Sequence, residues 1–299
     1  MSATQDTMSA GFEQLREQLL QRMPEPGNYP TPVSSVMLCR RNKSHQPENC
    51  FNKPILAMTV QGSKRTVVGN EVHHYTVGQA LLAGIDMPSM SYQLDATPEH
   101  PYLVISLELD MHLISLLSAQ LPKSTPTQIG KGAVIIDVEP ELRHSFSRLV
   151  DLFDKPEQVP VLAPVILQEI YLQLLLGPHG NFLKSINTQG THGHQISQAI
   201  HWLRSNFHQP LNVDELAAMT HMASSTFRKH FKGVTTMSPT EYHKHLRLYE
   251  AQRLMLEDHQ DASTAGYSVG YESPTQFNRE YKRLFGEPPQ RNISRLMSV

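Results

Sequence analysis

A repeat with a period of 50 residues dominates the last third of the chain. Five positions recur as aromatic, basic, aromatic, basic and proline: Phe227, Lys229, Phe231, Lys232 and Pro239 return as Phe277, Arg279, Tyr281, Lys282 and Pro289. Aromatic side chains four residues apart share one face of a helix, so each copy predicts a helix with a buried aromatic stripe and a polar, basic outer face. Two equivalent helices suit a regular target, and duplex DNA repeats about every 34 Å.

Residues 195–299 predict two helix-turn-helix units on a long connecting helix. Asn212 and Glu215 have the spacing of a capping box at the start of one helix, and the segment 224–232 (SSTFRKHFK) predicts the next. A long helix then begins at Ser238-Pro239 and reaches about residue 256, a rod of about 27 Å at 1.5 Å per residue. The second unit spans 262–286, with Ser273 as a better N-cap than its counterpart Ala223.

The polar faces of residues 224–232 and 274–285 supply the candidate DNA contacts. Arginine and glutamine have planar ends that match purine edges, whereas lysine suits phosphate. A polar helix face can also be merely solvated, but two such faces at a fixed spacing favour binding in a groove. The candidates are Ser225, Thr226, Arg228, Lys229, Lys232, Thr275, Gln276, Asn278, Arg279 and Lys282.

The segments HFKGVTTMSPTEYHKHLRLYEAQRLM and VGYESPTQFNREYKRLFGEPP resemble the two halves of the AraC/XylS-type DNA-binding domain, and the likeness covers nearly all of 195–299. The resemblance implies that both recognition helices enter consecutive major grooves. It assigns base reading to Ser225, Arg228, Lys229, Thr275, Asn278 and Arg279.

Three positions depart from the family pattern. Thr236 stands where a glycine is usual, as Gly286 is in the second copy, and Ala265-Gly266 replaces a bulky apolar residue followed by alanine. Glycine inside a helix costs about 1 kcal/mol relative to alanine. The substitution Gly266→Ala is therefore expected to raise the melting temperature.

The front part of the chain predicts a small β-barrel or sandwich flanked by helices. Short apolar runs over 55–60, 65–68, 72–77, 79–85 and 102–108 are separated by turn signals at 62–63, 69–70, 78 and 98. Helical periods cover 9–23, 110–121 and 139–154, and Pro164 is expected to open a further helix. The fold class is therefore α+β, with a domain at 1–186, a polar linker at 187–194 and a helical domain at 195–299.

The front domain also resembles the cupin-like amino-terminal domain of one AraC subgroup, over roughly residues 30–185. The resemblance implies that it binds a small effector, mediates dimerisation, or does both. Cys39, Cys50 and Lys64 are the candidate effector contacts: a thiolate could react with an electrophile or oxidant, and the lysine could contact an anion or carbonyl. Inert cysteines and a solvated turn lysine are the alternatives.

A metal site is not expected. His73, His74, His100 and His112 are present, but adjacent residues of a strand point to opposite faces, so the first two cannot share one cavity. The H-x-H and downstream glutamate spacing of metal cupins is missing. No cofactor and no catalytic residue are expected.

Composition constrains the function of the chain less than these motifs do. The chain has 26 Lys+Arg and 28 Asp+Glu; residues 195–299 hold 12 and 10 of them, leaving 14 and 18 for residues 1–194. This asymmetry permits a nucleic-acid partner without requiring one. The first residues lack the apolar core of a secretion signal, no run approaches the ~20 apolar residues of a membrane span, and only two cysteines occur. These features predict a soluble cytoplasmic protein.

Three functions stay open at this point. The first is a transcription regulator whose front domain senses a small molecule. The second is a constitutive DNA binder with a purely structural barrel, and the third is a metal-dependent cupin enzyme with a DNA-binding tail. The first two differ in whether a small molecule changes operator affinity. The expected partners are double-stranded DNA, RNA polymerase, a small-molecule effector and a second copy of the chain.

Overall fold

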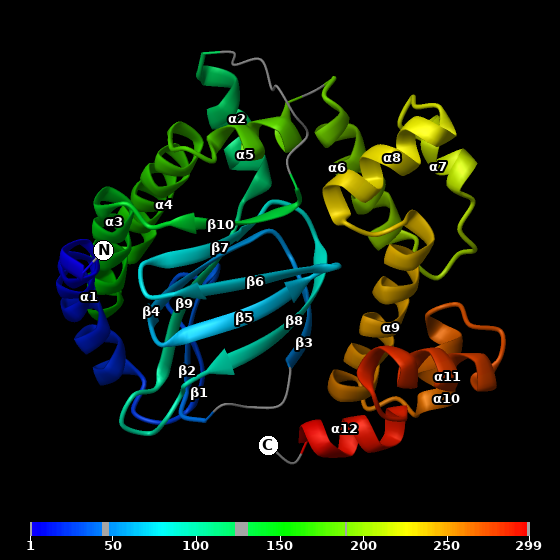
Figure 1. Ribbon diagram of the computed structural model, residues 1–299, viewed down its shortest axis with the longest axis horizontal. Coiled ribbons are helices and arrows are strands. Elements are labelled where there is room, and N and C mark those ends of the chain that lie inside the picture. Colours follow the sequence, from blue (N-terminus) through cyan, green and yellow to red (C-terminus); the bar gives the residue numbers. More distant parts are fainter. Residues whose placement is uncertain (1, 44–47, 123–130, 189, 298–299) are drawn as a thin grey trace.

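The computed structural model describes residues 2–43, 48–122, 131–188 and 190–297. Antiparallel sheets occupy the centre of the molecule, with α1, α3 and α4 on one side and α6–α12 on the other (Figure 1). The predicted α+β class is confirmed. The term barrel domain is used below for α1–α5 with the strands, and helical domain for α6–α12.

The barrel domain contains these elements in chain order: α1 (Ser2–Arg22), β1 (Gly27–Pro30), β2 (Val36–Arg41), β3 (Glu48–Asn52), β4 (Ile55–Gln61), β5 (Ser63–Val68), β6 (Glu71–Thr76), β7 (Gln79–Ala83), β8 (Met87–Leu94), β9 (Tyr102–Glu108), α2 (Met111–Gln120), β10 (Ala133–Asp137), α3 (Pro140–Asp151), a 3-10 turn (Leu152–Asp154), α4 (Val159–Leu176) and α5 (Gly180–Asn187). The helical domain contains α6 (His192–Ser205), α7 (Val213–Met219), α8 (Ser224–Thr235), α9 (Pro239–Glu257), α10 (Ala262–Ser268), α11 (Pro274–Phe285) and α12 (Pro289–Met297).

The strands form a six-stranded sheet in the order β1-β2-β9-β4-β7-β10 and a four-stranded sheet in the order β3-β8-β5-β6. All strand pairs are antiparallel, and the predicted turns at Gly62, Gly69 and Gly78 separate β4, β5, β6 and β7. In the four-stranded sheet Lys64 pairs with Gln93 on one side and Tyr75 on the other. This register places the three side chains in one row across the sheet.

Strand β8 was not predicted, and its burial pattern explains why. Ser89, Ser91 and Gln93 are buried along its length after Met87 and Pro88, whereas Met90 and Tyr92 are only partly buried. A strand that buries polar residues lacks the usual alternation of apolar and polar positions. Strand β1 lies in a proline-rich stretch and β10 follows a helical region, so neither was predicted. Helices α5 and α12 were also missed.

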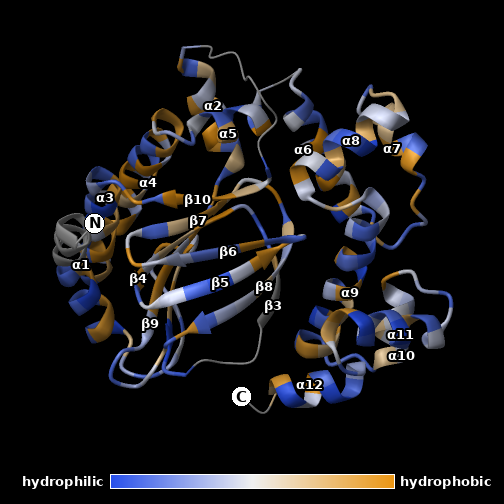
Figure 2. Ribbon diagram, viewed as in Figure 1, coloured by the Kyte–Doolittle hydropathy of each residue, from blue (hydrophilic) through white to orange (hydrophobic). Residues whose placement is uncertain are grey.

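The core of the barrel domain lies between the six-stranded sheet and the flanking helices. Phe12, Leu15 and Leu19 of α1 belong to the same buried cluster as Leu56 and Ile105 of the sheet. Each of these side chains is at most 2% exposed. In Figure 2 hydrophobic colours dominate β10 and α4, whereas hydrophilic colours dominate α11.

Helix α4 begins at Val159, so the predicted start at Pro164 is wrong. Pro160 occupies the first turn, where a missing N–H breaks no helical hydrogen bond. The buried stripe of α4 starts at Ala163 and continues through Ile166 and Ile170, so its first buried residue precedes Pro164.

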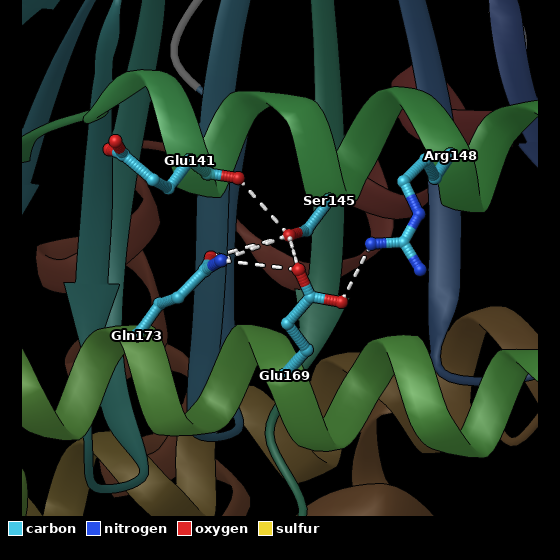
Figure 3. Close-up of polar contacts among 5 residues, drawn as sticks. All are labelled: Glu141, Ser145, Arg148, Glu169 and Gln173. Carbon is cyan, nitrogen blue, oxygen red and sulfur yellow. Dashed lines mark hydrogen bonds and ion pairs between the residues drawn. The ribbon is translucent and has the colours of Figure 1, made fainter.

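Helices α3 and α4 are joined by a polar network that Figure 3 shows. The buried Ser145 of α3 lies 2.9 Å from the carboxylate Oε1 of Glu169 on α4, and Gln173 Nε2 donates to Ser145 Oγ at 3.1 Å. Arg148 donates to the second oxygen of Glu169 at 2.8 Å. Each of these contacts gives a charged or polar group a partner between the two helices.

The outer face of α4 remains apolar. Val161 is 69% exposed and Val165 58% exposed, Leu162 is exposed beside them, and Leu176 is exposed at the C-terminal end of the helix. Among the described helices, α4 alone is long and apolar enough to cross a membrane by length and composition. Its opposite face is part of the barrel-domain core, as in the helices of many folded domains.

Candidate nucleic-acid interface

Helix α8 has the predicted buried and exposed faces. Phe227 and Phe231 are fully buried, with ring centroids 5.5 Å apart, and Phe231 packs edge-on against Tyr242 of α9. The other face is polar: Ser225, Arg228, Lys229 and Lys232 are exposed, and Thr226 is half-buried. Arg228 NH2 lies 3.7 Å from a carboxylate oxygen of Asp214 on α7.

Helix α11 repeats this arrangement. Phe277 and Tyr281 are fully buried and Phe285 nearly so, and their rings stack along the helix at centroid distances of 5.5 and 4.3 Å. The five candidate contacts on this helix are all exposed: Thr275, Gln276, Asn278, Arg279 and Lys282. Arg283 is also exposed one turn beyond Arg279 and was not among the candidates. Its position next to Lys282 in the sequence would have been enough to include Arg283 among the candidate DNA contacts.

Helix α9 connects the two units over 19 residues, Pro239–Glu257, close to the predicted 238–256. Ser238 caps it by accepting the N–H of Glu241 at 3.2 Å. The predicted N-cap at Asn212 is confirmed, since its Oδ1 accepts the backbone N–H groups of Asp214 and Glu215 at 3.1 and 3.4 Å. The reciprocal half of the box differs, because the Glu215 carboxylate accepts the Asn212 side-chain amide at 2.8 Å. The prediction for Ser273 is wrong in one respect: the residue occupies the N-cap, but its side chain makes no cap hydrogen bond. Pro274 instead fixes the first turn.

The packing around α10 argues against the expectation that Gly266→Ala raises stability. A Cβ at Gly266 would lie 3.0 Å from Cγ and 3.1 Å from Cδ1 of Phe277. Phe277 is fully buried, and the rings of Tyr271 and Tyr281 pack against it. The glycine therefore allows a close approach of α10 to α11, and the gain in helix propensity is outweighed by overpacking.

The helical domain docks on the four-stranded sheet of the barrel domain. The backbone N–H of Asn70 donates to Thr236 Oγ1 at 2.9 Å, and the Asn70 amide donates to the Thr236 carbonyl at 3.0 Å. On α9 the Tyr249 hydroxyl donates to the Ser89 carbonyl at 3.2 Å. The Phe51 ring packs edge-on against Tyr249 and a second tyrosine of α9, with centroids 5.8 Å apart in both cases.

Asp86 is the second anchor of this docking. It forms an ion pair with Arg204 of α6, and its backbone carbonyl accepts the hydroxyl of Tyr242 at 2.7 Å. Burial raises the pKa of the Asp86 carboxyl, and Arg204 acts in the opposite direction. No sequence pattern indicated these contacts, because they join residues more than 100 positions apart.

Two of the three candidate effector contacts meet around Tyr102. Lys64 Nζ lies 5.9 Å from the centre of the Tyr102 ring, and the half-buried Cys39 packs in the same small cluster. Burial raises the pKa of the Tyr102 hydroxyl, which lies 3.3 Å from Thr59 Oγ1. Cys50 pairs with Ser89 through the β3–β8 ladder, and its side chain is outside the described part of the structure.

The buried face of the four-stranded sheet next to Lys64 is polar. Thr66 Oγ1 lies 3.0 Å from the Tyr75 hydroxyl and 3.3 Å from Ser91 Oγ. Gln93 is 3% exposed, and its Oε1 has no hydrogen-bond partner. Buried hydroxyl and amide groups hydrogen-bond one another, and an acceptor that stays unpaired, such as Gln93 Oε1, can bind a polar ligand.

The histidines are dispersed. His74 is exposed and His73 half-buried, as adjacent strand residues should be, and His100 and His112 are exposed elsewhere. Within residues 2–43, 48–122, 131–188 and 190–297, no three His, Cys, Asp or Glu side chains are grouped to hold a metal ion.

A barrel domain that buries polar side chains on one face of its four-stranded sheet, and a helical domain with two matched helix-turn-helix units, define a class. It comprises regulators that combine a front regulatory domain with a DNA-binding domain of two helix-turn-helix units. Residues 32–182 match the family model described as the AraC-type transcriptional regulator N-terminus, and residues 216–294 match a helix-turn-helix domain model. The chain belongs to the AraC-type family of transcriptional regulators. Both resemblances noted in the sequence are thereby confirmed.

Curated relatives are distant. The chain is 26% identical to the HTH-type transcriptional regulator ArgR of Pseudomonas aeruginosa over 35% of this chain and 32% of that protein. It is 22% identical to the HTH-type transcriptional activator RhaS of Pectobacterium carotovorum over 50% of this chain and 52% of that one. It thus spans one third to one half of these relatives. For the MmsAB operon regulatory protein of P. aeruginosa the identity is 24% and the shares are 87% and 81%.

Solved structures with the same fold cover most of the chain. Fatty-acid-bound ToxT from Vibrio cholerae superposes with a TM-score of 0.59 at 13% identity, over 90% of this chain and 97% of ToxT. A second ToxT structure gives a TM-score of 0.59 at 11% identity, over 86% and 97%. At this identity the likeness establishes the arrangement of a barrel domain beside a helical domain, and only that.

Proposed function

We propose that the chain is a sequence-specific DNA-binding transcription activator whose barrel domain senses a small molecule. One observation carries the DNA-binding part: α8 and α11 bury matched aromatic stripes, expose matched polar faces, and are joined by the 19-residue helix α9. Two such helices on one rod suit two successive major grooves of a duplex. The division into residues 1–186, 187–194 and 195–299 is part of this proposal, although α6 of the helical domain already begins at His192, inside the proposed linker.

The exposed side chains divide by chemistry. Arg228 and Arg279 are proposed to read bases with Ser225, Thr275 and Asn278, because their fixed donor and acceptor patterns suit base edges. Lys229 belongs to the same base-reading group, whereas Lys232 and Lys282 are proposed to bind phosphates. Thr226 and Gln276 are the remaining proposed DNA contacts. They lie in the first turns of α8 and α11, where backbone N–H groups can also bind an anionic phosphate.

The proposed effector site is the buried polar region around Tyr102. Lys64 offers a cation, Cys39 a thiol, and Gln93 an acceptor without a partner. This set suits a small molecule with an anionic or carbonyl group. One solved ToxT structure with this fold holds an unsaturated fatty acid, which supports a small-molecule effector. Cys50 stays a candidate on the basis of its chemistry alone.

The barrel domain offers a physical route from that region to the DNA reader. Strand β5 runs from Lys64 to Val68 and continues through Gly69 to Asn70, which contacts Thr236 at the end of α8. Strand β8 carries both Gln93 and Ser89, the latter bonded to Tyr249 of α9. A ligand that shifts β5 or β8 would therefore act on the position of α8 and α9.

Two protein partners belong to the proposal. A second copy of the chain would cover the exposed apolar side chains of α4, including Val161 and Val165. Sedimentation of the wild type and of Val165→Glu tests this; a monomeric wild type would contradict it.

Activation of transcription implies RNA polymerase as the other partner. The homologues are named as transcription regulators, so no enzyme activity is proposed.

Binding-site selection from random duplex DNA tests the DNA-binding part. The purified full chain should enrich a bipartite sequence, and the double variant Arg228→Ala, Arg279→Ala should enrich none. The matched control is Arg143→Ala, which removes an arginine that lies on α3 of the barrel domain. Recovery of no enriched sequence by the wild type would contradict the proposal.

Thermal-shift screening of small anions and carbonyl compounds tests the sensing part. A ligand should raise the melting temperature of the wild type, change its affinity for the selected duplex, and lose both effects in Lys64→Met. Ligand effects that persist in Lys64→Met and in Cys39→Ser would remove these residues from the site. A chain whose DNA affinity responds to no compound would support the constitutive alternative.

A further inference from the structure

Arg247 lies in the middle of α9 and binds four backbone carbonyls. Its Nε donates to the Phe207 carbonyl at 2.7 Å, and its NH2 donates to the carbonyls of His208 and Gln209 at 3.1 and 2.8 Å. Its NH1 donates to the Gly270 carbonyl at 3.1 Å. The first three acceptors lie in the loop between α6 and α7, and the fourth lies in the turn between α10 and α11. One guanidinium therefore joins both helix-turn-helix units.

The backbone conformation at Gly270 fits this contact. Gly270 has φ +88, and a Cβ there would collide with the His208 carbonyl and crowd Arg247. The turn of the second unit thus approaches the α6–α7 loop of the first so closely that no side chain fits at Gly270. The two helix-turn-helix units therefore contact each other at Gly270 and His208, and the Arg247 guanidinium lies at this contact.

A chain of contacts continues from this point to the second recognition helix. The Arg247 guanidinium lies 5.9 Å from the centre of the Tyr271 ring. The Tyr271 hydroxyl donates to Glu280 Oε2 at 2.9 Å, and Glu280 is part of α11. Lys244, one turn before Arg247 on α9, lies 3.8 Å from the other oxygen of Glu280.

A second side chain of α9 also contacts the α6–α7 loop of the first unit. His243 Nε2 lies 2.9 Å from the Phe207 carbonyl, which Arg247 also contacts. The loop that leads into α7 is therefore held by two side chains of α9. A planar guanidinium with five donors can bridge such divergent acceptors, whereas an ammonium group acts from a single point.

We propose that Arg247 is a positioning residue for DNA recognition, which fixes the angle between α8 and α11 and so sets the half-site spacing that the chain accepts. The inference rests on the proposed reading of DNA by these two helices. A residue of this kind leaves each recognition helix intact. Its loss lowers the effective concentration of one helix at its half-site once the other is bound.

The test compares Arg247→Gln and Arg247→Lys with the wild type as full chains. Arg253→Gln is the matched control, because Arg253 lies on the same helix and pairs only with acidic side chains near it, Glu250, Glu257 and Asp258. Fluorescently labelled duplexes carry the site selected by the wild type, that site with one base pair inserted between its halves, or either half alone. One inserted base pair rotates the second half-site by about 35°.

The expected result for Arg247→Gln is half-site affinity within about twofold of the wild type and roughly tenfold weaker binding to the intact site. The preference for native over inserted spacing should shrink toward equality. Arg247→Lys should lie between Arg247→Gln and the wild type, and Arg253→Gln should match the wild type.

Unchanged spacing preference in a folded Arg247→Gln would overturn the inference, and so would full rescue by lysine. If Arg247→Gln loses helical circular dichroism, Arg247→Lys alone decides. A wild type that binds none of the duplexes would overturn the proposed function and this inference together, whereas a wild type that binds with spacing-independent affinity would overturn the inference alone.

Discussion

Thr236 Oγ1 accepts a hydrogen bond from the backbone N–H of Asn70 at 2.9 Å, which joins the end of recognition helix α8 to a hairpin of the barrel. Thr236 has φ 62, a left-handed conformation that usually favours glycine, and the equivalent Gly286 has φ 81. Gly69 next to Asn70 leaves room for the threonine side chain, because a Cβ there would collide with its hydroxyl. The departure from the family pattern at Thr236 thus has a structural role: it connects the two domains.

Removing the Thr236 hydroxyl should weaken this connection. Thr236→Val keeps the β-branched shape and the backbone strain but removes the acceptor for Asn70. The expected loss is about 1 kcal/mol in the free energy of unfolding, measured in urea. Thr236→Ser keeps the hydroxyl and is the control. Equal stabilities of the two variants would show that the hydrogen bond contributes nothing.

Arg279→Ala should reduce sequence discrimination. An exposed arginine on the groove face of α11 suits bidentate contact with guanine, and each such contact provides about 1–3 kcal/mol of discrimination. The quantity to measure is the difference in binding free energy between the selected duplex and one altered at a single base pair of the second half-site. A difference as large as that of the wild type would exclude base reading by Arg279.

Lys232→Ala should behave differently, because Lys232 is assigned to a phosphate. It should weaken binding to matched and scrambled duplexes to a similar extent. The slope of log affinity against log salt concentration should become shallower by about 1. Selective loss of affinity for the matched duplex would reverse the assignments of Lys232 and Arg279.

Gly266→Ala should lower the melting temperature. The added methyl group must displace the fully buried ring of Phe277 by a few tenths of an ångström, and overpacking of this kind typically costs about 1–3 kcal/mol. Gly233→Ala on α8 is the matched control, since a Cβ there has no heavy atom within 4 Å. That variant should be neutral or stabilising. A rise in melting temperature for Gly266→Ala would restore the expectation from helix propensity.

His243 should make stability depend on acidity. Burial lowers the pKa of its imidazole from 6.5 to about 4, and the Arg247 charge acts in the same direction. Between these pH values the unfolded chain binds a proton that the folded chain does not, so stability falls as the pH drops from 7 toward 4. The contribution reaches up to about 3 kcal/mol. His243→Gln keeps an N–H donor but does not titrate, and its stability should fall less over this range.

Short-range patterns predicted the DNA-reading part well. The 50-residue repeat located α8 and α11, and Ser238-Pro239 located the start of α9, because caps and aromatic periodicity are local properties of a helix. Reasoning from local patterns failed where packing between distant segments determines the residue or the strand. Gly266 costs helix propensity but is required by Phe277, and Ser89 and Gln93 form a strand that no apolar alternation indicates.

Contacts between distant segments had no local signal at all. Asn70 with Thr236, Asp86 with Arg204, and Arg247 with Gly270 each join residues whose proximity depends on the complete fold. Lys64 and Cys39 were chosen for their chemistry alone. Their convergence on Tyr102 follows from the strand register, which the sequence does not specify at these polar positions.

Methylation protection on the selected duplex tests the central claim most directly, because dimethyl sulfate reports on guanine N7 in the major groove. The account predicts two protected clusters about 10 base pairs apart on one face of the DNA. Arg279→Ala should lose protection in one cluster and keep it in the other. A single cluster, clusters on opposite faces, or protection that Arg279→Ala leaves intact in both would contradict the account.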